Sequence, residues 1–169
     1  FTYISGVNTL FNALLNTPGF DKLDFSALRV TLGGGMAVQG AVAARWKQVT
    51  GKVLTQAWGL TETSPAACIN PPGQDFNNSI GLPISSTEIA IVNDDGQALG
   101  IDEVGEICVR GPQVMLGYWN DDKATQLAID HAEWMHTGDL ATMDDEGYIN
   151  IVGRIKDMVI RGGENIYPR

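Results

Sequence analysis

The stretch LRVTLGGGMAVQGAVAARWKQVTGKVLTQAWG, residues 28–59, decides the fold. Its first five residues, LRVTL, are a candidate for a short buried strand, and three glycines follow at positions 33–35. The next segment places apolar side chains on one face of a helix, namely Val38, Val42, Trp46 and Val49. Residues 52–58 then have the composition of a second strand. A strand, a glycine turn, a helix and a strand together predict one βαβ crossover.

A second helix is expected before this unit, within residues 6–16. Apolar side chains recur there at helical spacing, at Val7, Leu10, Phe11, Leu14 and Leu15. Pro18 and Gly19 are expected to end this helix. The first 83 residues are therefore predicted to be part of an α/β subdomain with a mixed sheet.

The remainder of the chain changes character, because short strands alternate with turn signals over residues 84–152. The strands are expected at residues 86–92, 104–111, 139–143 and 148–154. A helix is expected at 121–129 and a last strand at 157–161, whereas 70–79 is the best candidate for an exposed loop. This spacing favours a small antiparallel, barrel-like β subdomain.

Composition narrows the function classes. The chain has 169 residues, of which 44% are hydrophobic and 18% are charged, so a folded domain is expected. Eleven basic and twenty acidic residues give a net charge of −9, which argues against a nucleic-acid binder. No apolar run approaches the roughly 18–20 residues that span a bilayer. No secretory leader is visible, and we expect a reducing, intracellular setting.

Several polar and sulfur-containing residues are interpreted as structural. Cys68 and Cys108 lack metal-ligand spacing and are expected to be small core residues. His131 and His136 have no ligand cluster at metal spacing, so solvated or packing histidines are the favoured interpretation. The acidic residues before Gly96 and Gly147 are interpreted as turn residues rather than a catalytic pair; they are Asp94, Asp95, Asp144, Asp145 and Glu146.

The glycines at 33–35 have two open interpretations. Glycine between a strand and a helix lets the backbone approach a ligand, and a helix N-terminus favours an anion, so a nucleotide site is one of them. The other is a tight turn that requires a positive φ. Neither the dinucleotide pattern nor a phosphate-binding P-loop fits, because Val38 and Val53 occupy positions that those motifs reserve for other residues.

The segment WGLTETSP, residues 58–65, follows the second strand of the crossover. Open α/β sheets bind ligands at the C-terminal ends of their strands. An aromatic face suits a base, a hydroxyl suits a phosphate, and a carboxylate suits Mg²⁺. A turn with a buried tryptophan and a capping threonine is the equally open structural alternative.

HTGD (136–139) is expected to end one segment and GRIKD (153–157) another, and both combine a carboxylate with basic side chains. The carboxylate could accept hydrogen bonds from both hydroxyls of a ribose, and an arginine could bind phosphate through its planar fork. Ordinary turn chemistry with a surface ion pair is the alternative.

These motifs occur together, and in this order, in one enzyme superfamily. The segments are TLGGGM (31–36), WGLTETSP (58–65), IGLP (80–83), GEICVRGPQVMLGYW (105–119), HTGDLATMDDEGY (136–148) and GRIKDMVIRGGENIYP (153–168). Over essentially its whole length the chain resembles the adenylate-forming, or AMP-binding, acyl-CoA synthetases. It looks most similar to bacterial long-chain fatty acid–CoA ligases.

The resemblance implies a reaction and its cofactors. Such enzymes activate a carboxylate with ATP and Mg²⁺ to an acyl adenylate, release pyrophosphate, and transfer the acyl group to coenzyme A. The implied partners are therefore a fatty acid, ATP and coenzyme A, with no nucleic acid. The expected location is cytoplasmic, and peripheral contact with the inner membrane face stays open, as does the oligomeric state.

Roles carry over by resemblance to matching positions. Gly34 and Gly35 would line the adenine and acyl side of the pocket, Trp58 would stack on adenine, and Gly59 would border the acyl carboxylate. The remaining implied roles are α-phosphate contact by Thr61, Mg²⁺ binding by Glu62, ribose binding by Asp139, ribose or phosphate contact by Arg154, the hinge at Lys156 and the coenzyme A path at Gly163. Thr61, Glu62 and Arg154 would be the catalytic residues. The family usually has tyrosine where Trp58 stands, so the hydroxyl is lost and a ring face is kept.

The resemblance also implies an organisation. Residues 1–83 would belong to the α/β subdomain, 84–155 to the β-rich subdomain, and 156–169 to the hinge and the start of a C-terminal domain. The family's phosphate-binding loop lies upstream of these motifs and its catalytic lysine downstream, so the chain is expected to be an internal fragment that is inactive alone.

Two alternatives stay open. The first is a medium-chain or aryl-acid ligase of the same superfamily, because the GGENIYP ending is also common there. The second belongs to another class and is a nucleotide-binding module without chemistry.

Overall fold

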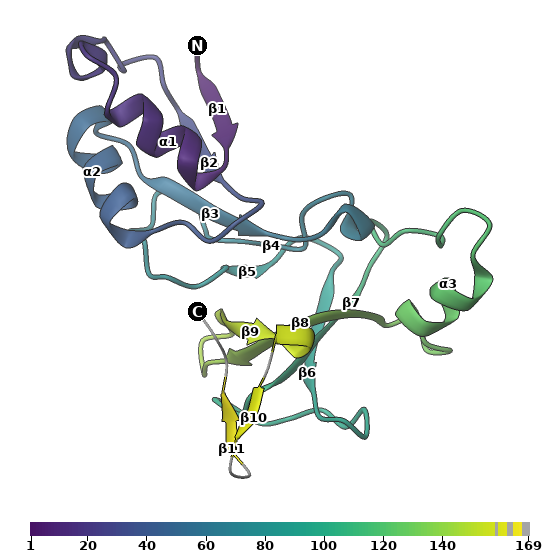
Figure 1. The fold of residues 1–169 in the computed structure, drawn as a ribbon. Helices are drawn as coiled ribbons and strands as arrows, with labels where there is room; N and C mark the ends of the chain where they lie inside the picture. The colour runs from purple at the N-terminus through teal and green to yellow at the C-terminus, as the bar shows by residue number, and fades with distance from the viewer. Residues whose placement is uncertain (158, 162–163, 167–169) are drawn as a thin grey trace.

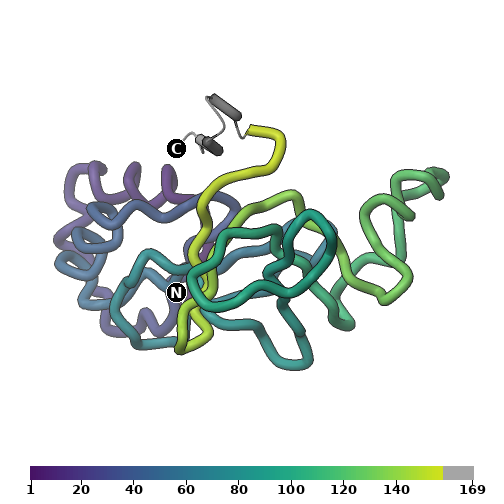
Figure 2. Tube along the Cα trace, turned by 90° about the horizontal axis from the view of Figure 1, so that it is seen from below, coloured from purple at the N-terminus to yellow at the C-terminus, as the bar shows by residue number. Residues whose placement is uncertain are grey.

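The computed structural model describes residues 1–157, 159–161 and 164–166. Figure 1 shows a helix-covered sheet built from the N-terminal part and a separate antiparallel sheet built from the later part. Helices α1 and α2 lie at one end of the molecule, and the segment around α3 projects at the other end in both Figure 1 and Figure 2.

The first sheet is mixed and has the order β1-β2-β3-β4-β5. Its strands are β1 (Tyr3–Gly6), β2 (Val30–Gly33), β3 (Leu54–Trp58), β4 (Cys68–Ile69) and β5 (Leu82–Pro83). Strands β1, β2 and β3 are parallel, whereas β4 and β5 are antiparallel to their neighbours. Because α2 connects the parallel neighbours β2 and β3, the predicted βαβ crossover is confirmed.

Helices α1 (Asn8–Leu15) and α2 (Gly40–Thr50) pack against each other beside this sheet. Trp46 is fully buried, and its ring meets Phe11 edge-to-face with the centroids 4.9 Å apart. This aromatic pair forms the centre of the first hydrophobic cluster, which also contains Phe20, Leu28, Val42 and Leu54. Most of the side chains that predicted α1 and α2 fill this core, whereas Val7 and Leu10 are exposed.

The second sheet contains four antiparallel strands in the order β6-β7-β8-β9. They are β6 (Glu88–Val92), β7 (Gly105–Arg110), β8 (Met135–Met143) and β9 (Ile149–Arg154). The predicted antiparallel pairing is confirmed, but in the described residues β6 does not pair with β9, so the sheet is open and not a closed barrel.

The remaining elements connect or follow these sheets. Helix α3 (Asp122–Ala128), predicted from the sequence, is capped by Asp121, whose side chain accepts a hydrogen bond from the Ala124 amide at 2.9 Å. A hairpin of β10 (Val159–Arg161) and β11 (Glu164–Ile166) ends the described chain. Single-turn 3₁₀ helices occur at Phe20–Lys22, Thr61–Thr63 and Ile155–Asp157.

The acidic residues before Gly96 and Gly147 lie in turns, as the sequence predicts. Asp144 closes the turn between β8 and β9, because its side chain accepts hydrogen bonds from the amides of Glu146 and Tyr148 at 3.1 and 2.8 Å. In the turn after β6, the neighbouring Asn93 side chain has this role and accepts from the amides of Asp95 and Gln97. Asx side chains commonly close turns in this way.

A short junction joins the two sheets. The Ile80 amide donates to the Ile149 carbonyl at 2.8 Å, and the Ile149 amide donates to the Gly81 carbonyl at 3.2 Å. The second hydrophobic cluster spans the same junction, because Ala67, Cys68 and Ile80 pack with buried residues of β6 to β9. The subdomain boundary expected at residue 83 therefore crosses a shared core, and it stays a prediction.

The loop at 70–79 is exposed along its middle and anchored at its ends. Asn70 and Ser79 are buried, and the side-chain amide of Asn70 donates to the Ser79 carbonyl at 2.8 Å. The buried Gln56 also donates to Ser79, at 2.8 Å, and accepts from the Val38 amide at 2.8 Å. One glutamine thus ties the loop to the segment that leads into α2.

Within the described residues, we find no helix that combines the length and the apolar character needed to cross a bilayer.

Candidate nucleotide site

Three side chains singled out in the sequence converge at one place. Trp58 ends β3, Asp139 lies in β8, and Arg154 ends β9. The indole nitrogen of Trp58 donates to Asp139 Oδ2 at 3.1 Å, across a sequence separation of 81 residues. Arg154 Nε lies 2.7 Å from Asp139 Oδ1. The register of β8 and β9 places Asp139 directly opposite Arg154, so the sheet itself sets this pair.

The Asp139 carboxylate is the buried centre of this group. Its side chain is 10% exposed, whereas that of Arg154 is 44% exposed. Arg154 Nε faces the carboxylate, and among the described residues the two terminal nitrogens make no hydrogen bond, so they can take an anion such as phosphate. The Trp58 ring is half-buried, packs against the second hydrophobic cluster and is fixed at its edge by the bond to Asp139, so a planar ligand could stack only on its exposed part.

The glycine turn after β2 lies beside the end of β3. The Gly34 amide donates to the Gly6 carbonyl at 3.1 Å, and a Cβ atom added to Gly34 would lie 3.3 Å from the Ala57 carbonyl oxygen. Gly35 is exposed and has a φ of +75°. Gly35 therefore has the positive φ that the turn interpretation requires, and the nucleotide interpretation stays a prediction.

The 3₁₀ turn Thr61–Thr63 follows the half-buried Gly59. Thr63, not Thr61, is the capping residue: it is fully buried and its hydroxyl accepts from the Leu60 amide at 2.8 Å. Thr61 is exposed and therefore available to a ligand. Glu62 accepts a hydrogen bond from the Tyr118 hydroxyl at 2.8 Å. That hydrogen bond raises the pKa of Tyr118, because it holds the phenol proton next to a carboxylate.

Not all of the expected site residues contact the group of Trp58, Asp139 and Arg154. In the portion that the structure describes, no hydrogen bond or ion pair links Thr61 or Glu62 to Trp58, Asp139 or Arg154. Lys156 is exposed in the 3₁₀ turn just after Arg154. Gly163 lies outside the described residues.

Comparison with known proteins identifies the family. Residues 1–119 match the sequence profile of the AMP-binding enzymes. The chain belongs to the AMP-binding enzyme family.

Individual relatives agree with this assignment. The chain is 53% identical to a long-chain-fatty-acid–CoA ligase of Escherichia coli O157:H7, over 99% of this chain and 30% of the ligase. It is 40% identical to a mitochondrial medium-chain acyl-CoA ligase of Macaca fascicularis, over 99% of this chain and 28% of that protein. It thus spans about 30% of the length of such relatives.

A solved structure shows the same fold. The o-succinylbenzoate coenzyme A synthetase of Bacillus subtilis, in complex with ATP and magnesium ion, superposes with a TM-score of 0.87 at 35% identity. The match covers 99% of this chain and 34% of that structure. The expected fold class, part of the N-terminal domain of an adenylate-forming enzyme, is confirmed.

The donor set of this AMP-binding chain fits a magnesium ion at Glu62. Tyr118 engages one carboxylate oxygen, and in the described part of the chain the other oxygen has no hydrogen-bond partner. Mg²⁺ prefers such hard oxygen ligands and commonly binds one or two carboxylates together with substrate phosphates. Tyr118 was not singled out from the sequence, although it lies within the quoted segment 105–119.

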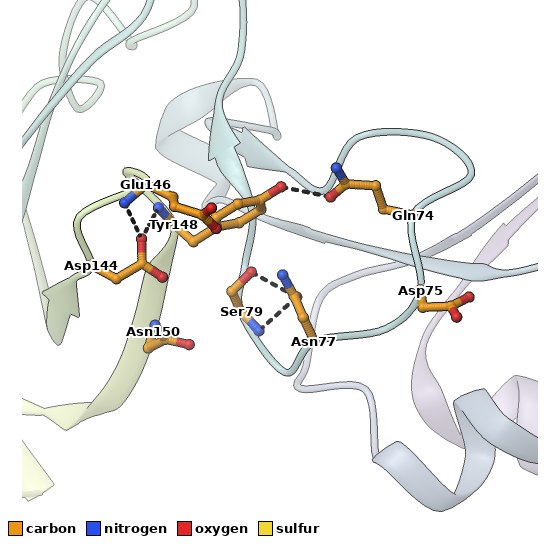
Figure 3. Close-up of a pocket in the computed structure, with 8 residues that line it drawn as sticks. All are labelled: Gln74, Asp75, Asn77, Ser79, Asp144, Glu146, Tyr148 and Asn150. Atoms are coloured by element: carbon orange, nitrogen blue, oxygen red, sulfur yellow. Dashed lines mark hydrogen bonds between the residues drawn. The ribbon is translucent and has the colours of Figure 1, made fainter.

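A polar cavity of the AMP-binding chain lies away from this site (Figure 3). It is formed by the loop at 70–79 and by the β8–β9 turn with the start of β9. Tyr148 closes one side by donating its hydroxyl proton to Gln74 at 2.6 Å. The lining residues are Gln74, Asp75, Asn77, Ser79, Asp144, Glu146, Tyr148 and Asn150, and none of the expected site residues is among them.

The histidines differ in their surroundings. His131 is exposed, whereas His136 is half-buried and lies beside Glu106 and Cys108. Spacing along the chain does not reveal this group, because the pairing of β7 with β8 assembles it.

The two cysteine thiols are expected to be unreactive in the folded chain. Both are free and buried, and burial raises the pKa of each to about 12, with the Glu106 and Asp130 carboxylates adding to the effect at Cys108. Only the thiolate is nucleophilic, and an ordinary cysteine has a pKa of about 8.5. At pH 8, a disulfide reagent such as dithionitrobenzoate should therefore react at least about 100-fold more slowly with the native chain than with urea-unfolded chain. A rapid phase in the native chain would contradict this.

Proposed function

We propose that this chain provides the nucleotide-binding face of an acyl-CoA ligase. The ligase activates a fatty acid with ATP to form an acyl adenylate and pyrophosphate, then transfers the acyl group to coenzyme A. The observation that carries the proposal is the convergence of Trp58, Asp139 and Arg154, in a chain of the AMP-binding enzyme family.

Each of these three side chains has a role that its contacts support. Trp58 stacks on adenine through the exposed part of its ring, whose edge is fixed by the bond to Asp139. Asp139 accepts hydrogen bonds from the ribose hydroxyls, and Arg154 uses its free terminal nitrogens for ribose or phosphate. Attack on the α-phosphorus places negative charge on non-bridging oxygens, which positioned donors and cations stabilise.

The roles proposed for the other residues follow from the family motifs in which these residues occur. Thr61 contacts the α-phosphate, Glu62 binds Mg²⁺, and Gly34, Gly35 and Gly59 line the adenine and acyl side of the pocket. Lys156 acts as the hinge between the two half-reactions, because it is exposed and follows the last strand of the second sheet. Gly163 borders the path of coenzyme A. We place the enzyme in the cytoplasm.

A long-chain fatty acid is the substrate that the relatives favour. The 53% identity to a long-chain-fatty-acid–CoA ligase exceeds the 40% identity to a medium-chain ligase. A medium-chain or aromatic acid is the second candidate, because a solved o-succinylbenzoate coenzyme A synthetase shares the fold at 35% identity.

Carboxylate-dependent exchange between ATP and pyrophosphate tests this function. We expect an intact protein containing this chain to exchange best with long-chain acids and the chain by itself to be silent. Acids of short, medium and long chain length, together with an aryl acid, separate the two substrate candidates. Silence of the intact protein with every acid would contradict adenylation and would favour a nucleotide-binding module without chemistry.

A further inference from the structure

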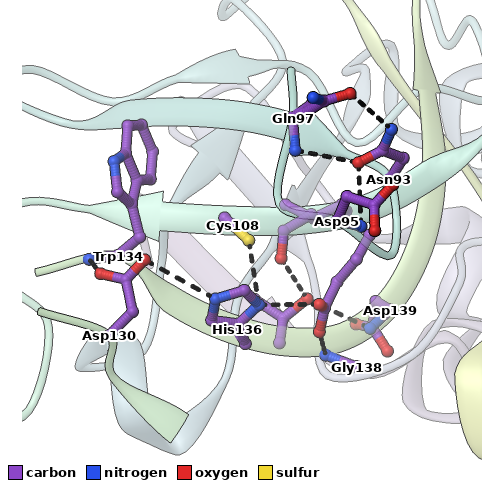
Figure 4. Close-up of polar contacts among 12 residues, drawn as sticks. Asn93, Asp95, Gln97, Cys108, Asp130, Trp134, His136, Gly138 and Asp139 are labelled. Atoms are coloured by element: carbon purple, nitrogen blue, oxygen red, sulfur yellow. Dashed lines mark hydrogen bonds and ion pairs between the residues drawn. The ribbon is translucent and has the colours of Figure 1, made fainter. Parts of the chain in front are cut away.

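Glu106, Cys108 and His136 bring three different metal-ligand atoms close together on β7 and β8. Figure 4 shows Cys108 and His136 side by side. His136 Nδ1 lies 2.8 Å from Glu106 Oε2 and 3.4 Å from Cys108 Sγ. One ligand atom from each residue lies within 4.8 Å of the other two. Cys108 pairs directly with His136, whereas Glu106 pairs with Leu140, and the register shifts between these two pairs. Glu106 and Cys108 are alternate residues of β7, which commonly share a face of a sheet.

Two arrangements fit these distances. A ring nitrogen of neutral histidine carries either one proton or one lone pair. If Nδ1 donates to Glu106, it cannot also accept from the Cys108 thiol, whose proton then has no acceptor on the ring. A single cation bound by one atom of each residue is the other arrangement, and it uses all three groups as ligands.

The surroundings hold two of these residues in place. The other carboxylate oxygen of Glu106 accepts from the Gly138 amide at 2.8 Å, so Oε2 stays directed at the histidine. His136 Nε2 lies 3.8 Å from Asp130 Oδ2, and Asp130 is itself held by the amides of Ala132 and Trp134 at 2.8 and 2.9 Å. A carboxylate behind the far nitrogen of a histidine and a bonded carboxylate ligand are typical surroundings of metal ligands.

We propose that Glu106, Cys108 and His136 bind a single Zn²⁺ ion, with a fourth position left for water. Zn²⁺ accepts mixed nitrogen, sulfur and oxygen ligands, and sites with three protein ligands keep an open position. The side chains of His136 and Glu106 are 32% and 18% exposed, so an ion reaches the site from solvent, with the buried Cys108 behind. The proposal rests on these side chains and is independent of the proposed function.

Cobalt provides the spectroscopic test. One equivalent of Co²⁺ added to the metal-free full chain should give a thiolate-to-cobalt charge-transfer band in the near ultraviolet, and one equivalent of Zn²⁺ should remove it. Competition with a chromophoric chelator then gives the Zn²⁺ affinity. A hydrogen-bonded cluster that binds no metal predicts no band and no competition, and either result would overturn the proposal.

Matched variants locate the ion. Cys108→Ser and His136→Gln should each abolish the band or weaken Zn²⁺ binding by at least about tenfold. Cys68→Ser, at the other buried cysteine, and His131→Gln, at the exposed histidine, should retain both the band and the affinity. Equal loss in the control variants would overturn the assignment.

A measurement on the unmodified chain covers the case in which a core variant fails to fold. Long-range ¹H–¹⁵N correlation spectra resolve the ring nitrogens of the two histidines. One equivalent of Zn²⁺ should shift Nδ1 of His136 and leave His131 unchanged. A shift at His131 alone, or at neither residue, would contradict the site.

Discussion

Replacing Asp139 by alanine is expected to weaken ATP binding by the intact enzyme at least about 100-fold, or about 2.8 kcal/mol. The carboxylate lies between Trp58 and Arg154, so its removal leaves an indole N–H and a guanidinium without their partner. It also removes the proposed acceptor of both ribose hydroxyls, and hydrogen bonds to charged groups contribute about 1.5–3 kcal/mol each. Because Arg154 is 44% exposed, most of the loss should come from ribose.

Titration calorimetry with ATP and with 2′,3′-dideoxy-ATP separates these contributions. The unaltered enzyme should bind the dideoxy nucleotide much more weakly, whereas the Asp139→Ala variant should bind the two nucleotides equally, as a double-mutant cycle requires for a direct contact. Asp145→Ala removes the same charge from the exposed turn after β8 and should leave binding unchanged. Binding of ATP by Asp139→Ala within threefold of the unaltered enzyme would refute the ribose assignment.

Replacing Gly81 by alanine is expected to lower the free energy of unfolding by about 4 kcal/mol or more. Gly81 has a φ of +95°, and an added methyl group would overlap the backbone of Ile69 and Asn70. Relief of this overlap would move the Gly81 backbone. The Gly81 carbonyl accepts a hydrogen bond from the Ile149 amide, so the contact between the two sheets would be weakened as well. Domains are commonly stable by only about 5–15 kcal/mol, so this variant should be largely unfolded or close to it.

Gly73→Ala is the matched control for this prediction. Gly73 has a similar φ of +87°, but nothing lies within 4 Å of an added methyl group. It should therefore cost only the left-handed strain of about 1–2 kcal/mol. Urea unfolding followed by circular dichroism gives both values, and equal losses would show that the crowding at Gly81 is unimportant.

Elements with a repeated hydrophobic pattern could be predicted from the sequence. The βαβ unit, helix α3 and the four strands of the second sheet occur where periodicity and turn residues indicate them, except that β8 begins at Met135 and not at Asp139. The alternative interpretation of HTGD (136–139) as a turn is therefore wrong, because β8 pairs with both β7 and β9 and extends through these residues. Strand β1 was missed, and so were β4 and β5, which have two residues each. Two residues cannot display an alternating pattern, and β4 forms because β3 and β5 offer it partners on both sides.

The candidate nucleotide site, too, could be predicted from the sequence only in part. The residue types of Trp58, Asp139 and Arg154 suited a nucleotide, but their proximity depends on the meeting of β3 with β8 and β9, which no local pattern encodes. The Glu106–Cys108–His136 group was missed for the same reason. A partial signal existed, because residues two apart in a predicted strand share a face, and Glu106 and Cys108 are two such residues.

The junction at Ile80, Gly81 and Ile149 has an evolutionary consequence. Trp58 projects from one sheet, whereas Asp139 and Arg154 belong to the other, and the cluster that packs between the sheets contains Ala67, Cys68 and Ile80. Protein interiors are close-packed, so a change of volume in this cluster alters the angle between the sheets. Natural selection can therefore adjust nucleotide affinity through residues that never touch the nucleotide, while every binding side chain stays the same.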